Sequence, residues 1–530
     1  MPDDQHSGLQ NADNPSPSEQ RLTIHLDGSP LSASMVEIVA QSRAHVEIHP
    51  DARQRVALCR ESLENAAERG ATHYGINTGF GKFSRQRVEA SELRELQANL
   101  IRSHAAGVGD PLPSEIVRAV MLILAASLTR AKSGVRPELI DSLIGLLNGG
   151  LTPVVPETGS VGASGDLAPL AHIALALIGE GSVFDTNGVQ RNAASALSDA
   201  GLKPVVLEAK EGLALINGTH LMCARFALLR QRFERLWPAA VAAATMSLDA
   251  CRATDAFLDP RVYEARNQPG PSRVAESMLA MLQGSEIIPS HDNADDPRVQ
   301  DPYSIRCAPY VLGAVLDSAT SIWERLDAEL GAVTDNPLVL PASTGGGVDI
   351  VSAGNFHGMP VAIPLDTLAI GLAHIAGIAE RRIDQMLSAH DPETHLRPFL
   401  SPKPGLHSGL MIVQYTAAAL CNELAGLAAP ASVVNIPTSA GIEDYNSFGP
   451  RSAAKADRAM DLVERVVAIE LLCAAQALEA HRPLRSGKGV ERAHEAVRTV
   501  VPPLSSDRPP SPDIEAIASL IGAGAFADSV

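Results

Sequence analysis

The feature that most constrains the fold is a series of long segments rich in alanine and leucine, in which apolar residues recur at every third or fourth position. This spacing predicts α-helices. Only 3% of the residues are aromatic, and several segments are apolar on most sides, so they must lie inside a bundle, which other copies of the chain could complete. The segments are 113–134, 167–181, 220–253, 308–331, 359–387 and 455–481.

Composition excludes several classes of function. The 530 residues carry a net charge of −18 with no long basic run, which argues against binding to nucleic acid or to an anionic membrane. The six cysteines never form a CxxC pair, so zinc ribbons are excluded and buried thiols in a reducing compartment are expected. The N-terminus has neither a basic start nor an apolar core, and the longest clean apolar run, 119–128, is shorter than the ~20 residues that span a bilayer. These observations predict a cytoplasmic protein.

The sequence divides into four parts. Residues 1–20 read as a disordered polar tail, 21–230 as an N-terminal domain that carries the loop discussed next, 231–500 as a long helical bundle, and 501–530 as a Pro-rich segment followed by a helix. Near the start, RLTIHL and HVEIHP alternate like short strands that could pair. We therefore expect an all-α-dominated fold with a small mixed α/β part at the N-terminus.

Between the predicted helices lie loops rich in Gly, Asn, Asp and Ser, without a GxGxxG, Walker A or HExxH motif. One loop contains Ala163-Ser164-Gly165. In a tight bend the Gly165 nitrogen could attack the Ala163 carbonyl, and loss of water from Ser164 would leave a methylidene electrophile, which no side chain provides. The alternative is structural: Ser164 or Asp166 caps a helix that has Pro169 in its first turn.

Seven motifs, in this order, resemble the aromatic amino acid ammonia-lyases, and the histidine-specific members most closely: YGINTGFG, SHAAGVGDPL, GSVGASGDLAPLAH, KEGLALINGTH, VQDPYSIRC, TDNPLV and GNFHG. The resemblance implies a fumarase/aspartase-like helical lyase architecture. It also implies that Ala163, Ser164 and Gly165 form 4-methylidene-imidazol-5-one autocatalytically, with no diffusible cofactor and no metal. In such enzymes the substrate amine adds to this group, and a tyrosine, matched here by Tyr74, removes the β-proton.

Further site residues follow from the same motifs. Gln300, Tyr303 and Arg306 recur at three-residue steps, which turns them towards one side of a helix start. The forked guanidinium of Arg306 suits an α-carboxylate, and the resemblance assigns this role to it. The alternative, a surface ion pair, is common for arginines in general but is disfavoured within QDPYSIRC. The resemblance places Gln300 and Tyr303 beside the prosthetic group and the amine, Asn217 on the modified ring, and Phe356 packed over it; Phe356 could equally fill a core.

Ser103, His104 and Glu443 bear on the choice of substrate. The resemblance places this polar pair and this carboxylate around the side chain of the substrate in histidine-selective members, and such groups suit an imidazole that both donates and accepts hydrogen bonds. A core role for His104 and a capping role for Glu443 are the alternatives. The sequence departs from the histidine-specific pattern at five positions near the expected pocket: His220, Gly331, Gly441, Ile442 and Tyr445.

The sequence thus predicts an ammonia-lyase that converts L-histidine to trans-urocanate. The departures leave tyrosine, phenylalanine or a modified histidine open as substrates, and an aminomutase would use the same loops. A non-catalytic helical assembly protein is a further alternative, which the intact Ala163-Ser164-Gly165, Tyr74 and Arg306 disfavour. The resemblance also implies a homotetramer in which several subunits build each active site.

Overall fold

The computed structural model describes residues 22–68, 89–291, 297–343 and 347–530. Its helices are α1 Ala33–Ala40, α2 Pro50–Glu68, α3 Leu93–His104, α4 Ser114–Thr129, α5 Pro137–Asn148, α6 Leu167–Leu177, α7 Ala193–Asp199, α8 Glu211–Ile216, α9 His220–Ala250, α10 Pro260–Arg266, α11 Pro269–Met281, α12 Tyr303–Arg306, α13 Ala308–Leu330, α14 Met359–Ser388, α15 Met411–Leu427, α16 Gly449–Leu478, α17 Lys488–Arg498 and α18 Ser511–Gly522. The predicted fold class, mainly α-helical with small strands, is confirmed.

In the described ranges the strands are short and belong to four small sheets. They are β1 Leu22–Leu26, β2 Ala44–Ile48, β3 Val108–Pro111, β4 Thr152–Pro153, β5 Pro156–Thr158, β6 Ser182–Phe184, β7 Gln190–Asn192, β8 Leu338–Pro341 and β9 Val348–Val351. The two strands predicted near the start pair in parallel, with Leu22 opposite Ala44 and Leu26 opposite Ile48. The other pairs, β3 with β5, β4 with β6, β6 with β7, and β8 with β9, are antiparallel.

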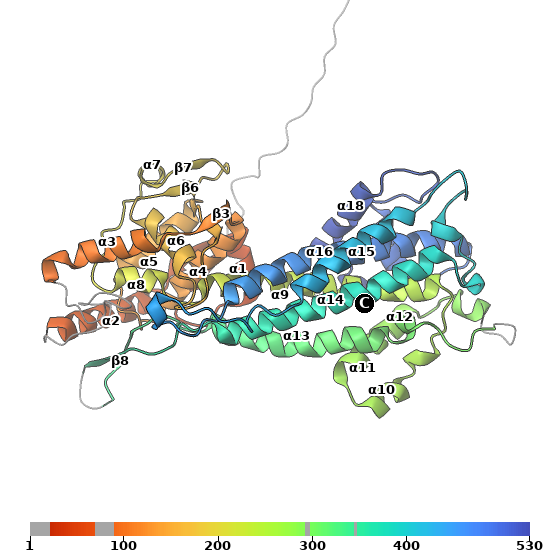
Figure 1. Cartoon of the computed structure of the whole chain (residues 1–530), viewed down its shortest axis with the longest axis horizontal. Coiled ribbons are helices and arrows are strands. Elements are labelled where there is room, and N and C mark those ends of the chain that lie inside the picture. The colour runs from red at the N-terminus through yellow and green to blue at the C-terminus, as the bar shows by residue number, and fades with distance from the viewer. Residues whose placement is uncertain (1–21, 69–88, 292–296, 344–346) are drawn as a thin grey trace, which may run out of the picture.

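Long helices form the bundle that occupies the right of Figure 1, whereas α1 to α8 and most of the strands lie at the left. In the bundle α14 packs against α13, α15 and α16. Helix α9 packs against α4 at the left and against α16 in the bundle, and it runs across the predicted domain boundary at residue 230. All residues of α4 from Ile116 to Thr129 are buried, as expected for a helix that is apolar on most sides.

A buried ion pair crosses the bundle interior. Arg382 of α14 is 1% exposed, and its Nη2 donates to Glu470 Oε2 of α16 at 2.9 Å. Ser247 of α9 donates a further hydrogen bond to the same carboxylate at 2.8 Å. The pair is saturated with partners, which a buried charge requires.

The sequence predicts buried thiols and no apolar run long enough to span a bilayer, and the structure bears on both predictions. All six cysteines are free; Cys223, Cys251 and Cys473 are buried, and the other three are partly exposed. Burial raises the pKa of Cys251 to about 12, so its thiol stays protonated. Within the described residues α14 alone is long and apolar enough to cross a membrane, and half of its most apolar window is buried in this protein, as in a core helix.

Candidate active site

The loop between β5 and α6 holds Ala163-Ser164-Gly165 against the segment that precedes α9. Gly218 N–H donates to the Ser164 carbonyl at 3.1 Å, and Asp166 N–H donates to the Gly218 carbonyl at 2.7 Å. Gly165 has φ +77°, and a Cβ there would lie 2.1 Å from the Gly218 oxygen. Only glycine therefore fits this position.

A serine closes the loop upon itself. Ser160 Oγ donates to the Gly165 carbonyl and accepts from Gly162 N–H, both at 3.1 Å. The chain from 160 to 165 is thus bent tightly around the triplet, with an unhindered nitrogen at Gly165. A bend of this kind, with a glycine at the attacking position, fits the five-membered ring that the triplet would form.

Asp166 does not cap the helix that follows it. Its side chain makes no capping bond to α6; instead Oδ2 accepts the backbone N–H groups of Leu221 and Met222 in the first turn of α9, at 2.8 and 3.2 Å. Burial raises the pKa of this carboxyl to about 7. Asp166 was expected to cap α6 but caps α9 instead. Pro169 lies in the first turn of α6, as predicted.

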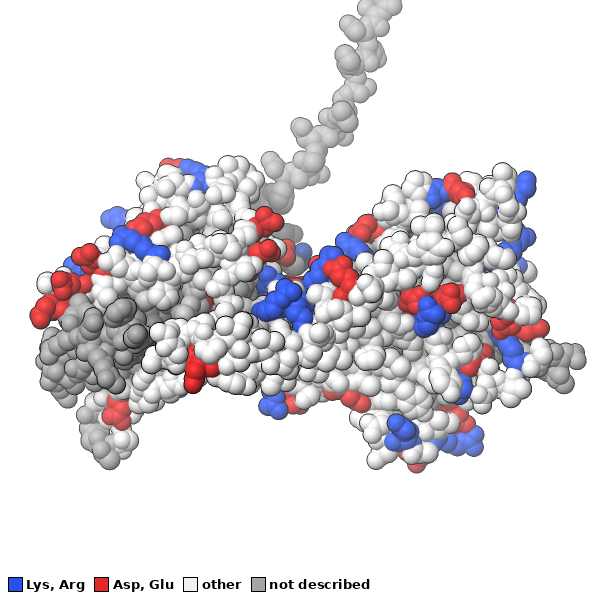
Figure 2. Space-filling model, viewed as in Figure 1, with Lys and Arg blue, Asp and Glu red and all other residues white. Residues whose placement is uncertain are grey.

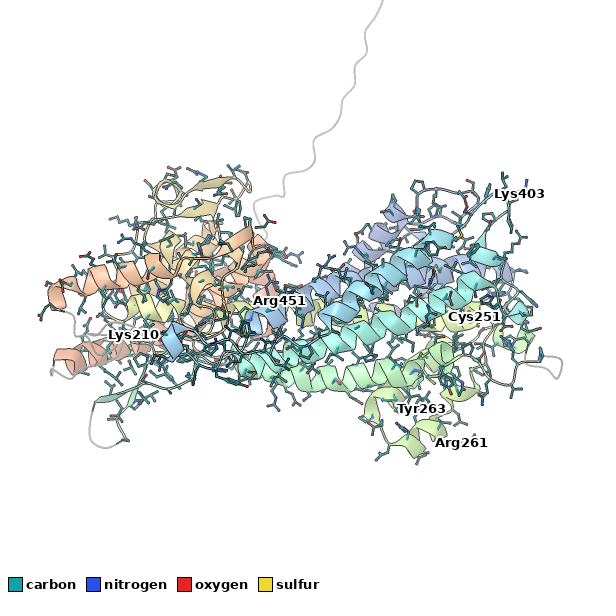
Figure 3. The ribbon with its side chains drawn as sticks, in the orientation of Figure 1. Lys210, Cys251, Arg261, Tyr263, Lys403 and Arg451 are labelled. Carbon is teal, nitrogen blue, oxygen red and sulfur yellow. The ribbon has the colours of Figure 1, made fainter. Side chains whose placement is uncertain are left out.

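Asn217 is held beside the triplet by a buried ion pair that the sequence did not reveal. Its Nδ2 donates to the Asn336 carbonyl at 3.0 Å, while its buried Oδ1 has no hydrogen-bond partner among the residues described. Lys210, labelled at the left of Figure 3, donates to Asp335 at 2.6 Å, and Asp335 in turn accepts Asn336 N–H. The free oxygen is a buried acceptor beside the loop.

Two further loops reach the triplet loop. Asn336 Oδ1 accepts Ala353 N–H at 2.7 Å, which fixes the start of the segment that carries half-buried Phe356. The segment that carries Glu443 ends where Ser447 Oγ donates to the Gly162 carbonyl at 3.1 Å. Phe356 and Glu443 are thus on loops tied to the same corner of the molecule as Ala163-Ser164-Gly165.

Ser103 and His104 end α3, which packs against α6 and α8. Ser103 Oγ donates to the Leu100 carbonyl at 3.0 Å and lies 3.1 Å from His104 Nδ1. His104 Nδ1 lies 2.9 Å from the same carbonyl, which favours the tautomer that leaves Nε2 as an acceptor. Ser103 is exposed and His104 is half-buried. The partial exposure of His104 argues against the alternative that it is a core residue.

Gln300, Tyr303 and Arg306 do share one side, as predicted. Arg306 Nη2 donates to Gln300 Oε1 at 2.8 Å, and its guanidinium carbon lies 4.5 Å from the centre of the Tyr303 ring. Tyr303 is 70% exposed. The three side chains line a cavity of about 460 Å³, together with Arg298, Asp301, Pro302, Gln385, His390 and Asp391.

This cavity lies about the length of α13 away from the triplet along the bundle. Helix α12 immediately precedes α13, whose 23 residues span roughly 34 Å at the usual rise per residue. Asn336, the partner of Asn217, follows the other end of α13, and Figure 1 places α12 far from α6 and α8. One copy of the chain therefore does not bring Arg306 to Ala163-Ser164-Gly165.

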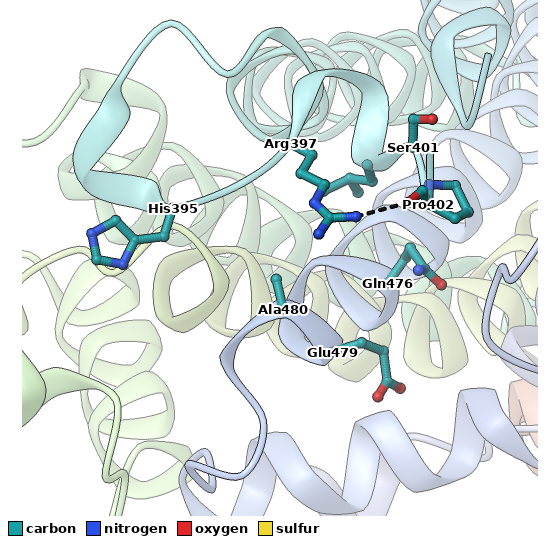
Figure 4. Close-up of a pocket in the computed structure, with 8 residues that line it drawn as sticks. His395, Arg397, Ser401, Pro402, Gln476, Glu479 and Ala480 are labelled. Atoms are coloured by element: carbon teal, nitrogen blue, oxygen red, sulfur yellow. Dashed lines mark hydrogen bonds between the residues drawn. The ribbon is translucent and has the colours of Figure 1, made fainter. Parts of the chain in front are cut away.

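Tyr74 lies outside the described residues. A second cavity of about 430 Å³ contains none of the predicted site residues; His395, Arg397, Gln476 and Glu479 are among those that line it (Figure 4). Within 22–68, 89–291, 297–343 and 347–530, no cluster of three or more His, Cys, Asp or Glu side chains could hold a metal ion.

The five residues that depart from the histidine-specific pattern have different surroundings. His220 is buried against Gly218, where a Cβ would lie 2.6 Å from its Cε1. Burial, aided by the nearby Arg130 charge, lowers the pKa of His220 to about 3, so its imidazole is neutral. Gly441 has φ +86° in a tight turn, and Ile442 and Tyr445 are mostly exposed. Gly331 ends α13.

Comparison with known proteins identifies the family. Residues 31–499 match the family model described as aromatic amino acid lyase. A histidine ammonia-lyase from Anaeromyxobacter sp. (strain K) is 46% identical over 508 residues, which cover 95% of this chain and 99% of that protein. The crystal structure of histidine ammonia-lyase from Trypanosoma cruzi has a TM-score of 0.87 and 38% identity, over 96% of this chain and 95% of that one. Tyrosine aminomutase from Streptomyces globisporus also has a TM-score of 0.87, with 34% identity over 96% and 98%. The chain belongs to the aromatic amino acid lyase family.

Proposed function

We propose that the protein is a histidine ammonia-lyase, a carbon–nitrogen lyase that converts L-histidine to trans-urocanate and ammonia. The observation that carries the proposal is the tight bend at Ala163-Ser164-Gly165, where Gly165 has no room for a side chain. Full-length similarity to histidine ammonia-lyases supports the same reaction.

The prosthetic group is part of this proposal. Ala163, Ser164 and Gly165 would form 4-methylidene-imidazol-5-one, held by the Gly218 backbone, Ser160 Oγ and Asn217. When formed, this group supplies the carbon electrophile that ammonia elimination requires. The unpartnered Asn217 Oδ1 is available to accept a hydrogen bond there. Because this oxygen is buried away from water, such a hydrogen bond is favourable.

The chain's other residues bind and orient the substrate. The Arg306 fork pairs with the α-carboxylate, because its planar donors match two carboxylate oxygens. Gln300 and Tyr303, which contact Arg306, would lie beside the amine. Tyr74 is the proposed base for the β-proton, for which its ordinary pKa of ~10 would need lowering.

The imidazole would be recognised by polar groups from two loops. Ser103 and His104 offer a hydroxyl and a ring acceptor, and Glu443 accepts an imidazole N–H. Phe356 would pack over the ring of the prosthetic group. A phenyl ring in such a site would leave these groups unpaired, at roughly 1–3 kcal/mol each.

The distance between Arg306 and the triplet supports sites shared between copies, in a cytoplasmic homotetramer. An exposed apolar stripe on α14 and α15 offers a surface for assembly; it comprises Ile363, Ile370, Ile412 and Tyr415. Figure 2 shows wide areas without charged side chains along the bundle. Such patches are typical of protein–protein contact.

The substrate is tested by offering the purified protein histidine, tyrosine or phenylalanine and following the ultraviolet absorbance of each conjugated acid. We expect urocanate from histidine and little product from the others. Ammonia from tyrosine alone, or a β-amino acid as main product, would instead support the other lyase specificity or an aminomutase. No product from any of them, with unmodified Ser164 by intact mass, would support an assembly protein.

Shared sites are tested by complementation. Ser164→Ala chains, which should be inactive alone, and Arg306→Leu chains, which should keep at most about a tenth of the wild-type kcat/KM, are co-expressed and purified as mixed assemblies. If Ser164 and Arg306 of one site come from different chains, about a quarter of the sites carry both intact residues and activity returns. If both come from one chain, the mixture has no more kcat/KM than the Arg306→Leu chains alone.

A further inference from the structure

We propose that Thr438 is a positioning residue that orients the Glu443 carboxylate and thereby contributes to selection of an imidazole ring. The inference rests on the proposed function, because it assigns Glu443 to the substrate side chain. Thr438 Oγ1 donates to Glu443 Oε2 at 2.9 Å. Among the described residues, the Glu443 carboxylate has no other hydrogen-bond partner. Both residues are half-buried.

The backbone brings these two side chains together. Thr438 N–H donates to the Glu443 carbonyl at 2.9 Å, and Glu443 N–H donates back to the Thr438 carbonyl at 3.3 Å. Between them Ser439, Ala440 and Gly441 have φ of +52°, +54° and +86°. Two non-glycine residues in the left-handed region cost roughly 1–2 kcal/mol each, so the surrounding bonds must hold this turn in place.

The segment that carries the turn is fixed at its start. Asp366 of α14, which is buried, accepts the N–H groups of Ala431 and Ser432 at 3.1 and 2.9 Å. Lys455 of α16 lies 3.3 Å from the same carboxylate and donates to the Ala429 carbonyl. The ion pair thus attaches the segment to two long helices of the bundle.

The same segment is fixed at its end. Phe448 N–H donates to the Val161 carbonyl at 3.0 Å, next to the Ser447 bond to the triplet loop. His357 Nε2 lies 3.1 Å from the Tyr445 carbonyl, and the two rings stack with centres 6.4 Å apart. The backbone around Glu443 is therefore set by several independent contacts. The rotation of its carboxylate, by contrast, depends on Thr438, whose bond leaves Oε1 for a ligand.

The test compares Thr438→Val, which keeps the shape but loses the hydroxyl, with Thr438→Ser, which keeps it. Each is made alone and with Glu443→Gln, and Thr320→Val on α13 is the control for losing a threonine hydroxyl that bonds only its own helix. Turnover of histidine and phenylalanine and the melting temperature are measured. For Thr438→Val we expect KM for histidine to rise about tenfold, kcat to change less than about twofold, and the histidine-to-phenylalanine ratio of kcat/KM to fall about tenfold.

Thr438→Ser should stay within about twofold of wild type, and Thr438→Val should add little in the Glu443→Gln background, because coupled residues are not additive. Two results would overturn the proposal while leaving the lyase function standing. One is an equal loss of kcat/KM in Thr438→Val and Thr438→Ser. The other is an effect of Thr438→Val that is just as large in the Glu443→Gln background. A wild type that does not deaminate histidine would overturn both. If Thr438→Val does not fold, Thr438→Cys, a much weaker donor, takes its place.

Discussion

At the scale of single residues, Ser164 is the sharpest test, because it supplies the electrophilic carbon of the proposed prosthetic group. Ser164→Ala should reduce turnover by more than about a thousandfold, the range expected when the chemical step loses its main catalytic group. Intact mass should show that the wild type, but not the variant, has lost two water molecules. Ser142→Ala, whose hydroxyl bonds only the Glu138 carbonyl within α5, is the control. Full activity in Ser164→Ala would rule out the proposed group.

Gly165 is the second residue on which the proposed ring depends. Gly165→Ala would place a Cβ 2.1 Å from the Gly218 oxygen at a backbone φ of +77°. We expect the variant to lack the two-water mass loss and to be less stable by more than about 1 kcal/mol. Gly188→Ala, with φ +74° but open space around its Cβ, separates strain from the clash. A cyclised, active Gly165→Ala protein would contradict the geometry described here.

Arg306 tests substrate binding. Arg306→Leu should lower kcat/KM by ten- to a hundredfold, mainly through KM, because a charged hydrogen-bonded pair contributes about 1.5–3 kcal/mol. Arg306→Lys should recover only part of this, since an ammonium lacks the planar fork. An unchanged KM in Arg306→Leu would place the carboxylate elsewhere.

At the scale of elements, the start of α9 predicts a pH dependence. The folded-state pKa of His220 is lowered to about 3 from 6.5, so the unfolded chain binds a proton first as the pH falls. Its contribution to stability is complete above pH 6.5 and is lost towards pH 3, by about 1.4 kcal/mol per unit. His220→Gln should therefore gain about 2 kcal/mol relative to wild type between pH 7.5 and 5. Denaturant unfolding at fixed protein concentration measures this; equal pH dependence in both proteins would contradict it.

At the scale of the whole molecule, the proposed site depends on assembly. Ile370→Lys and Tyr415→Lys place charges on the exposed stripe of α14 and α15. We expect a lower mass by light scattering and a proportional loss of turnover, because a site on a separated copy would lack either Arg306 or the triplet. Val189→Lys, at an equally exposed apolar side chain near β7, should change neither. Full activity in a monomeric Tyr415→Lys protein would show that one chain suffices.

Much of this could be predicted because local signals were strong. The helices over 113–134 and 308–331 follow from periodic apolar residues, and the shared side of Gln300, Tyr303 and Arg306 follows from their spacing. The Lys210–Asp335 pair, Ser160 and the Thr438–Glu443 turn left no such signal. Their partners are distant in sequence, or they depend on backbone angles that composition does not specify.

The amino-acid sequence by itself determined the helical class and the family, and it singled out the Ala163-Ser164-Gly165 triplet, because periodicity and contiguous motifs are local properties of a chain. Only the tertiary structure decided that Asp166 caps α9 and not α6, and that α13 separates Arg306 from the triplet. The reason is physical: which helix end meets a carboxylate, and how far a rigid helix carries a side chain, depend on packing between elements far apart in sequence.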